Sequence, residues 1–142
     1  MSDTKQRILA VLQQGHGFLA SLATVTENGE PWVRYVTGTI RDDMTIRVAT
    51  SLQSRKVAHV QAKPHVHLIC GNIDPSVDAP YFQIQGTAEI ATDMEEKQAV
   101  WHEDLAYYFQ TLENPDWCVL KIHPRRITVH SMTTMDAEVW TE

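Results

Sequence analysis

Two β-type runs, Arg34-Tyr35-Val36-Thr37-Gly38-Thr39 and Ile46-Arg47-Val48-Ala49-Thr50-Ser51, are joined by a short polar turn at Arg41-Asp42-Asp43. The second run ends in hydroxyl side chains and leads into Ser54-Arg55-Lys56 at the start of a predicted helix. Hydroxyls, cations and the free amides of a helix N-terminus are groups that bind phosphate. We therefore predict an anion site at this junction, formed by Thr50, Ser51, Ser54, Arg55 and Lys56 and completed by Arg34 from the neighbouring strand.

The same residues also have a simpler interpretation. Arg55 and Lys56 can form a solvated basic helix start, and Arg34 can be an outward-facing strand residue. Thr50 and Ser51 can simply end a strand. Two cations at a helix N-terminus are unfavourable against the helix dipole, and a nearby anion reverses that penalty. This electrostatic argument favours the anion site.

The ordered set of Arg34, Thr50 and Ser54-Arg55-Lys56 resembles the pyridoxamine 5'-phosphate oxidase family of FMN-binding split barrels. In that family the FMN phosphate is held between an arginine that opens one strand, a threonine that ends the next, and a Ser-Arg-Lys triplet. The resemblance extends more weakly from Phe18 to Ser131. It implies FMN as cofactor, bound at the subunit interface of a homodimer. It also implies contacts between the flavin ring and the strand that carries Tyr35, Val36, Thr37 and Thr39.

Several positions depart from the oxidases. The oxidases carry a lysine at the position of Thr39 and a glutamine at that of Tyr81. Near the last strand, His130 stands where they have a tryptophan, so His130 is included among the candidate cofactor-binding residues. No Arg-x-His substrate motif follows it. We therefore expect no true pyridoxamine 5'-phosphate oxidase activity, and the resemblance is closer to the general-stress-protein subgroup, whose substrates are generally unassigned.

The rest of the chain predicts a mainly β fold with flanking helices. Helical periodicity covers Asp3 to Gln14 and Ser54 to Gln61, and a third helix, capped by Thr92, runs to about Leu112. The predicted strands are Phe18–Val25, Trp32–Ile40, Thr45–Thr50, His65–Gly71, Tyr81–Ala91, Trp117–Ile122 and Ile127–Met132, with Gly86 a candidate bulge. Six or seven short strands with two or three helices indicate a closed antiparallel barrel. The resemblance implies an antiparallel split β-barrel, as one domain over residues 1–142.

The composition and net charge limit the classes of binding partner and indicate the cellular compartment. The net charge of −6 argues against a nucleic-acid or acidic-membrane partner, although it permits a local basic pocket. No apolar run is long enough to span a bilayer, and the N-terminus lacks a signal-peptide pattern. The two cysteines, Cys70 and Cys118, lie far apart in sequence and belong to no CxxC motif. We therefore expect a reduced cytoplasmic setting.

Other chemistries find little support. His65 and His67 share one face of a strand, but no third metal ligand is evident, so we predict no metal site. Residues 101–104 place a His beside a Glu without the spacing of a zinc-binding HExxH helix. The chain also lacks the Gly-x-Ser-x-Gly elbow of an esterase. No general base or other catalytic residue is identified.

Two functions from different classes follow. The first is a small FMN-dependent oxidoreductase with a small-molecule redox partner, such as a reduced nicotinamide, although no dinucleotide fingerprint is present. The alternative is a non-catalytic flavin-binding protein acting as a store or sensor, and relatives in the wider split-barrel group also use deazaflavin or haem. A cofactor-free structural domain is the third possibility.

Overall fold

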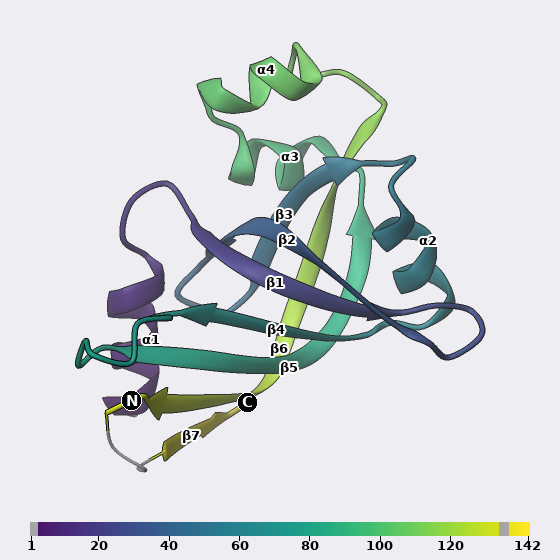
Figure 1. Ribbon diagram of the computed structural model, residues 1–142. Coiled ribbons are helices and arrows are strands. Elements are labelled where there is room, and N and C mark those ends of the chain that lie inside the picture. The colour runs from purple at the N-terminus through teal and green to yellow at the C-terminus, as the bar shows by residue number, and fades with distance from the viewer. Residues whose placement is uncertain (1–2, 134–136) are drawn as a thin grey trace.

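The computed structural model, which describes residues 3–133 and 137–142, is a β-barrel with flanking helices (Figure 1). In this part of the chain, seven antiparallel strands pair in the order β3-β2-β1-β4-β5-β6-β7, and a further pairing of β3 with β6 closes six of them. The strands are β1 (Phe18–Val25), β2 (Pro31–Ile40), β3 (Ile46–Ser51), β4 (His65–Gly71), β5 (Pro80–Ala91), β6 (Trp117–Ser131) and β7 (Ala137–Thr141). The predicted fold class, an antiparallel split barrel with flanking helices, is confirmed.

Helices cover the barrel from different sides. Figure 1 shows α1 (Asp3–Leu12) and α2 (Arg55–Ala62) on opposite sides of it. Helix α3 (Met94–Val100), a 3₁₀ turn η1 (Glu103–Leu105) and α4 (Ala106–Phe109) stand over the region where β3 meets β6. This last group forms a lobe beside the end of β3, where the sequence predicts the anion site.

Period-2 alternation builds the core of the barrel. In β3, Ile46, Val48 and Thr50 are buried, whereas the residues between them are half-buried on the outer face. The interior is filled by side chains from every strand of the barrel and by α1 and α2, including Ile8, Leu22, Val60, Leu68, Ile84 and Ile122. Each such side chain contributes roughly 1.5–3 kcal/mol when removed from water. A second, smaller cluster of Val100, Trp117 and Val119 joins the α3 lobe to the outer face of β6.

The prediction of the third helix is wrong about the residue at which the helix starts and about its continuity to Leu112. Asp93, not Thr92, caps α3 by accepting a hydrogen bond from the Glu96 amide at 3.3 Å. The helix ends because Trp101 adopts an extended conformation (φ −66°, ψ 133°), which lets its ring pack against Trp117. Helical structure resumes only at η1 and α4.

The strand prediction is also wrong at the C-terminal end. The two strands predicted at residues 117–122 and 127–132 are one strand, β6, and β7 was not predicted. Pro124 lies opposite Gly86, where the β5–β6 pairing changes register, so a residue without an N–H is accommodated at an irregularity. The bulge predicted at Gly86 is confirmed.

Candidate functional site

A cleft of about 800 Å³ lies between the outer face of β2 and β3 and the lobe that carries α3, η1 and α4. Thr37 and Thr39 on β2 and Ala49 on β3 form part of one wall, and Tyr108 and Phe109 on α4 lie across from them. We call this space the β2–β3 cleft. Its volume is in the range of cavities that hold cofactors.

One end of the β2–β3 cleft contains the predicted phosphate donors. Thr50, Ser51, Ser54 and Lys56 all line it. The hydroxyl oxygens of Thr50 and Ser54 lie 3.2 Å apart, and Ser54 is the N-cap of α2 without a hydrogen bond from its side chain to the helix amides. The Ser51 hydroxyl accepts a hydrogen bond from the Gln53 amide at 3.1 Å. Strand end and helix start thus converge on one hydroxyl-rich corner.

The charge at this corner is positive and not balanced by acidic side chains. Burial lowers the pKa of Lys56, and the nearby charge of Arg34 lowers that pKa further. Across the described residues, no carboxylate forms an ion pair with Arg34, Arg55 or Lys56. A buried ammonium without a counter-ion is unfavourable, and a bound phosphate would remove that cost.

The two predicted arginines are near this corner but do not line the β2–β3 cleft. Arg34 turns its guanidinium to the Leu22 carbonyl at 3.2 Å and the Thr24 hydroxyl at 2.7 Å. Arg55 lies over the Trp32 ring, 5.2 Å from the ring centroid. Burial lowers the pKa of Arg34.

The predicted flavin-ring residues divide between three environments. Thr37 and Thr39 line the β2–β3 cleft, whereas Val36 points into the barrel and is buried. Tyr35 is 76% exposed and lines a different cavity. His130 lines neither cavity, although its ring stacks on Tyr81 of the second one, and its Nε2 lies 2.8 Å from the Gln83 side-chain oxygen.

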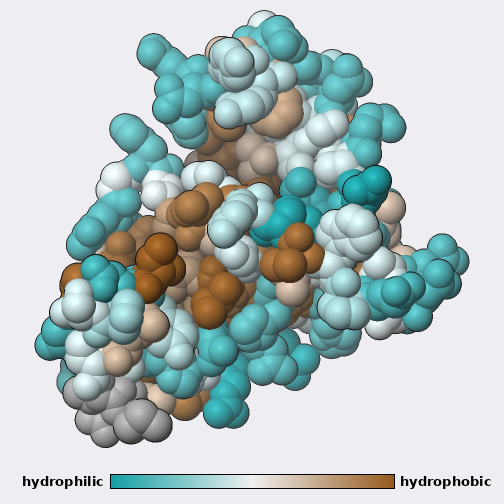
Figure 2. Space-filling view, in the orientation of Figure 1, coloured by the Kyte–Doolittle hydropathy of each residue, from teal (hydrophilic) through white to brown (hydrophobic). Residues whose placement is uncertain are grey.

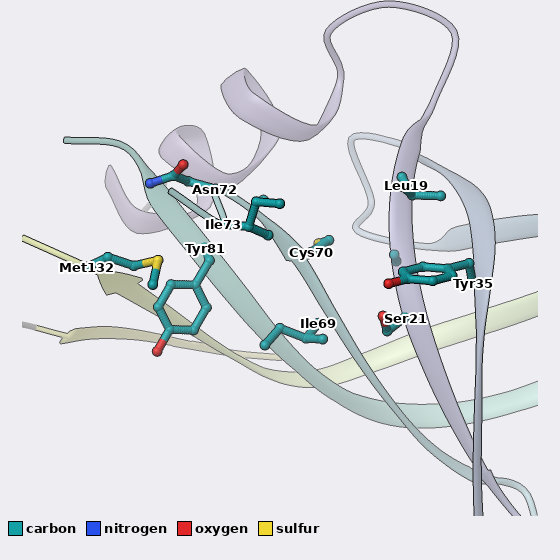
Figure 3. Close-up of a pocket in the computed structure, with 11 residues that line it drawn as sticks. Leu19, Ser21, Tyr35, Ile69, Cys70, Asn72, Ile73, Tyr81 and Met132 are labelled. Atoms are coloured by element: carbon teal, nitrogen blue, oxygen red, sulfur yellow. The ribbon is translucent and has the colours of Figure 1, made fainter. Parts of the chain in front are cut away.

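The second cavity, of about 600 Å³, is apolar and was not predicted from the sequence (Figure 3). Figure 3 shows Leu19, Ser21 and Tyr35 on one side, facing Ile69, Cys70, Ile73, Tyr81 and Met132 across the space. Brown, apolar side chains gather over this region in the space-filling view (Figure 2). The sequence did contain a signal for this cavity, because Leu19 and Ile69 are large apolar residues at positions where the strand alternation points outward.

The other end of the β2–β3 cleft rests on a charged cluster that the sequence did not reveal. Glu96 on α3 accepts hydrogen bonds from Arg47 Nε at 2.5 Å and from Lys121 Nζ at 2.8 Å. These bonds, with that from Arg47 the larger, lower the pKa of Glu96 to about 2. His16 and His102 also line the cleft, and their rings stack with centroids 6.1 Å apart. The cluster ties the α3 lobe to the barrel and so fixes the cleft wall.

Neither a metal centre nor a membrane span is found in residues 3–133 and 137–142. No three His, Cys, Asp or Glu side chains come together in an arrangement that would hold a metal ion. No helix there has the length and apolar character needed to cross a bilayer. Both cysteines are free and buried, and burial raises the pKa of Cys70 to about 12.

Comparison with known proteins gives consistent matches. Residues 5–131 match the family model described as "Pyridoxamine 5'-phosphate oxidase". General stress protein 26 of Bacillus subtilis (strain 168) is 33% identical over 125 residues, which cover 88% of this chain and 86% of that protein. The crystal structure of General Stress Protein 26 from Bacillus anthracis str. Sterne is 26% identical, with a TM-score of 0.82 over 99% of this chain and 100% of that chain.

Three more distant structures share the fold alone and differ in their described ligands. An FMN-binding protein of Nostoc punctiforme is 13% identical (TM-score 0.74; 100% of this chain, 97% of that one). A haem-binding protein of Mycobacterium smegmatis is 16% identical (TM-score 0.73; 97% and 58%). An F420 reductase is 20% identical (TM-score 0.64; 84% and 94%).

Proposed function

Because this chain belongs to the pyridoxamine 5'-phosphate oxidase family, we propose that it is an FMN-binding protein and a small oxidoreductase. The observation that supports FMN best is the corner of the β2–β3 cleft where a half-buried Lys56, without a carboxylate partner in the described residues, meets the hydroxyls of Thr50, Ser51 and Ser54. These groups match the phosphate of FMN, and the adjacent start of α2 adds backbone amides.

The rest of the β2–β3 cleft suits the flavin ring. Two wall residues on β2, Thr37 and Thr39, carry short side chains, so a flat ligand can lie close to this strand. Tyr108 and Phe109 on α4 offer aromatic surface on the opposite side and limit access of water. FMN, when bound, would supply the electron-transfer chemistry, and the residues of this chain would bind and orient it.

A homodimer with FMN at the subunit interface is part of the same proposal. The apolar cavity carries several large side chains exposed to solvent in one chain, including Leu19 (64%), Tyr35 (76%) and Ile73 (90%). The β2 strand presents Tyr35 to this cavity and Thr37 to the β2–β3 cleft, so a second copy seated on the apolar face would also lie beside the cofactor. Such contiguous apolar surface marks an interaction site.

The alternative is a non-catalytic flavin store or sensor. The reductive partner in the enzyme version is a small molecule such as a reduced nicotinamide. The two free, buried cysteines suit a reducing compartment, so a cytoplasmic location belongs to the proposal. Turnover of reduced nicotinamide by the flavin-loaded protein separates the enzyme from the store.

The test of cofactor identity compares FMN with riboflavin, which has the same ring system and lacks the phosphate. A visible spectrum and mass analysis of released ligand first establish what the purified protein carries. Titration of the apo-protein should then show FMN binding at least about tenfold more tightly than riboflavin, since each charge-assisted hydrogen bond contributes roughly 1.5–3 kcal/mol. Equal affinities would contradict a phosphate site at Lys56.

A further inference from the structure

Arg34 is held by a chain of hydrogen bonds that links three elements. Its Nη1 donates to Thr24 Oγ1 on β1 at 2.7 Å, and Thr24 Oγ1 lies 2.8 Å from His59 Nδ1 on α2. A guanidinium only donates, so the Thr24 oxygen accepts from Arg34 Nη1, and His59 Nδ1, 3.4 Å from Arg34 Nη2, faces a second guanidinium donor. His59 Nδ1 is therefore an acceptor, and the neutral ring carries its proton on Nε2.

Protonation of His59 is opposed by its surroundings. Burial is the first cause of the lowered pKa of His59, followed by the charges of Arg34 and Arg55. Arg34 Nη2 lies only 3.4 Å from Nδ1, so a proton there would bring two cations into contact. Trp32 supplies an aromatic edge, with ring centroids 6.3 Å apart.

Among residues 3–133 and 137–142, no acidic side chain forms an ion pair with Arg34 or Arg55. Besides β2, the elements that pack most extensively against α2 are β1, which contributes the uncharged Thr24 hydroxyl, and β5. The sole charged side chain of β5, Glu89, lies 3.3 Å from His123 instead. In the part of the chain that the structure describes, the charges that act on His59 are therefore cationic.

We propose that His59 is a positioning residue for Arg34, and that binding of a phosphate-bearing ligand at the start of α2 is coupled to uptake of a proton by His59. This inference rests on the proposed FMN site. A phosphate near Lys56 and Arg55 offsets the positive charge that disfavours the imidazolium. Once protonated, Nδ1 no longer accepts, and repulsion moves the Arg34 guanidinium away from His59 and toward the anion.

The coupling predicts tighter FMN binding at lower pH. A ligand that raises the pKa of His59 binds with proton uptake, so affinity rises as the pH falls through the histidine range. One coupled proton gives at most about tenfold in affinity per pH unit. Ionisation of the FMN phosphate itself, with a pKa of about 6, acts equally on wild type and variants and cancels in their comparison.

The experiment compares wild type with His59→Asn, whose side-chain oxygen can replace the Nδ1 acceptor but does not titrate. His65→Asn, an exposed histidine of β4 outside both cavities, is the matched control. FMN binding is measured by calorimetry from about pH 8 to about pH 6 in buffers of different ionisation enthalpy. Wild type and His65→Asn should take up more protons than His59→Asn and gain about threefold to tenfold more affinity over this range.

Equal proton uptake and equal pH dependence in wild type and His59→Asn, with FMN binding intact, would overturn the inference and leave the FMN site standing. If the wild type binds no FMN at any pH, the proposed function fails and this inference fails with it. A second measurement does not depend on the variant's folding. The imidazole NMR signal of His59 in the wild type should show a raised pKa when FMN is added, and an unchanged pKa would also overturn the coupling.

Discussion

The hydroxyl oxygens of Thr50 and Ser54 lie 3.2 Å apart, and this contact joins the end of β3 to the N-cap of α2. Strand and helix are separated by a turn of only three residues, 52–54. Hydroxyls, the first amides of the helix and Lys56 are therefore presented together, within one turn of the chain. The proposed anion site depends on short-range structure, so we expect substitutions here to affect ligand binding more than the fold.

We expect Lys56→Ala to weaken FMN binding by about tenfold or more, because one charge-assisted contact is lost. Riboflavin affinity should stay the same, since riboflavin has no phosphate. The apo-protein should melt at the same or a slightly higher temperature, because the variant removes a desolvated cation from a helix start. Lys63→Ala, at the opposite end of α2, is the control and should leave FMN binding unchanged. FMN titrations that do not distinguish the two variants would remove Lys56 from the site.

Ile73→Asp should dissociate the proposed homodimer. Ile73 is 90% exposed in one chain, so the substitution costs the monomer little, whereas a carboxylate in an apolar interface costs at least about 2 kcal/mol. Light scattering at micromolar concentration should report a dimer for wild type and a monomer for this variant. Val77→Asp, in the same loop but outside the apolar cavity, should remain dimeric. A monomeric wild type with flavin bound would contradict the proposed assembly.

Much of the barrel was predictable because its strands follow period-2 alternation and are bounded by turn residues. The family resemblance, drawn from Arg34, Thr50 and Ser54-Arg55-Lys56, is confirmed by the family match over residues 5–131. The continuity of β6 was not predictable, since Pro124 resembles a strand end until Gly86 is known to face it. These two residues are 38 positions apart and meet only in the folded sheet.

The directions of side chains within the site were harder to predict from the sequence than the strands were. Arg34 turns toward Thr24 and His59, which come from two other elements and carry no local signal. Arg47 and Glu96 are likewise 49 residues apart in sequence, and their contact depends on where α3 docks. Local pattern thus predicted which residues gather near the hydroxyl-rich corner, but not which of them line the cleft.

Substitution of Glu96 by Gln should destabilise the protein by about 1–3 kcal/mol, because Arg47 and Lys121 then lose their shared carboxylate. The folded pKa of Glu96, about 2, lies below its usual 4.5, so its contribution is complete above pH 4.5 and disappears as the pH falls through about 2. Urea unfolding should therefore show a gap between wild type and Glu96→Gln that closes in acid. Glu95→Gln, exposed on the same helix, should show no gap; a gap for Glu96→Gln that is as large at pH 2 as at pH 7 would refute the ion-pair explanation.

Gly86→Ala should cost about 2 kcal/mol or more, because a Cβ atom at this position would lie 2.5 Å from the His123 carbonyl oxygen. Backbone atoms cannot move aside without breaking the β5–β6 pairing. Gly38→Ala is the matched control, since its nearest contact is the Phe18 ring at 3.1 Å, and a side chain can shift. Denaturation midpoints should fall clearly further for Gly86→Ala, and similar midpoints would show that the bulge tolerates a side chain.

Pyridoxamine 5'-phosphate should not be oxidised at a useful rate, because the substrate phosphate needs a second set of free cations near the flavin. At the far end of the β2–β3 cleft, Arg47 is bound to Glu96, Asp104 adds a negative charge, and Thr39 is neutral. Arg125 and Arg126 on β6 are both exposed. The C-terminal region where the oxidases carry their Arg-x-His motif has no arginine here and contains two acids, Asp136 and Glu138. Its residues 134–136 lie outside the described structure. FMN-loaded protein incubated with this substrate and oxygen should show no saturable rise of pyridoxal 5'-phosphate absorbance, whereas turnover of about 1 per second or faster would place the chain with the true oxidases.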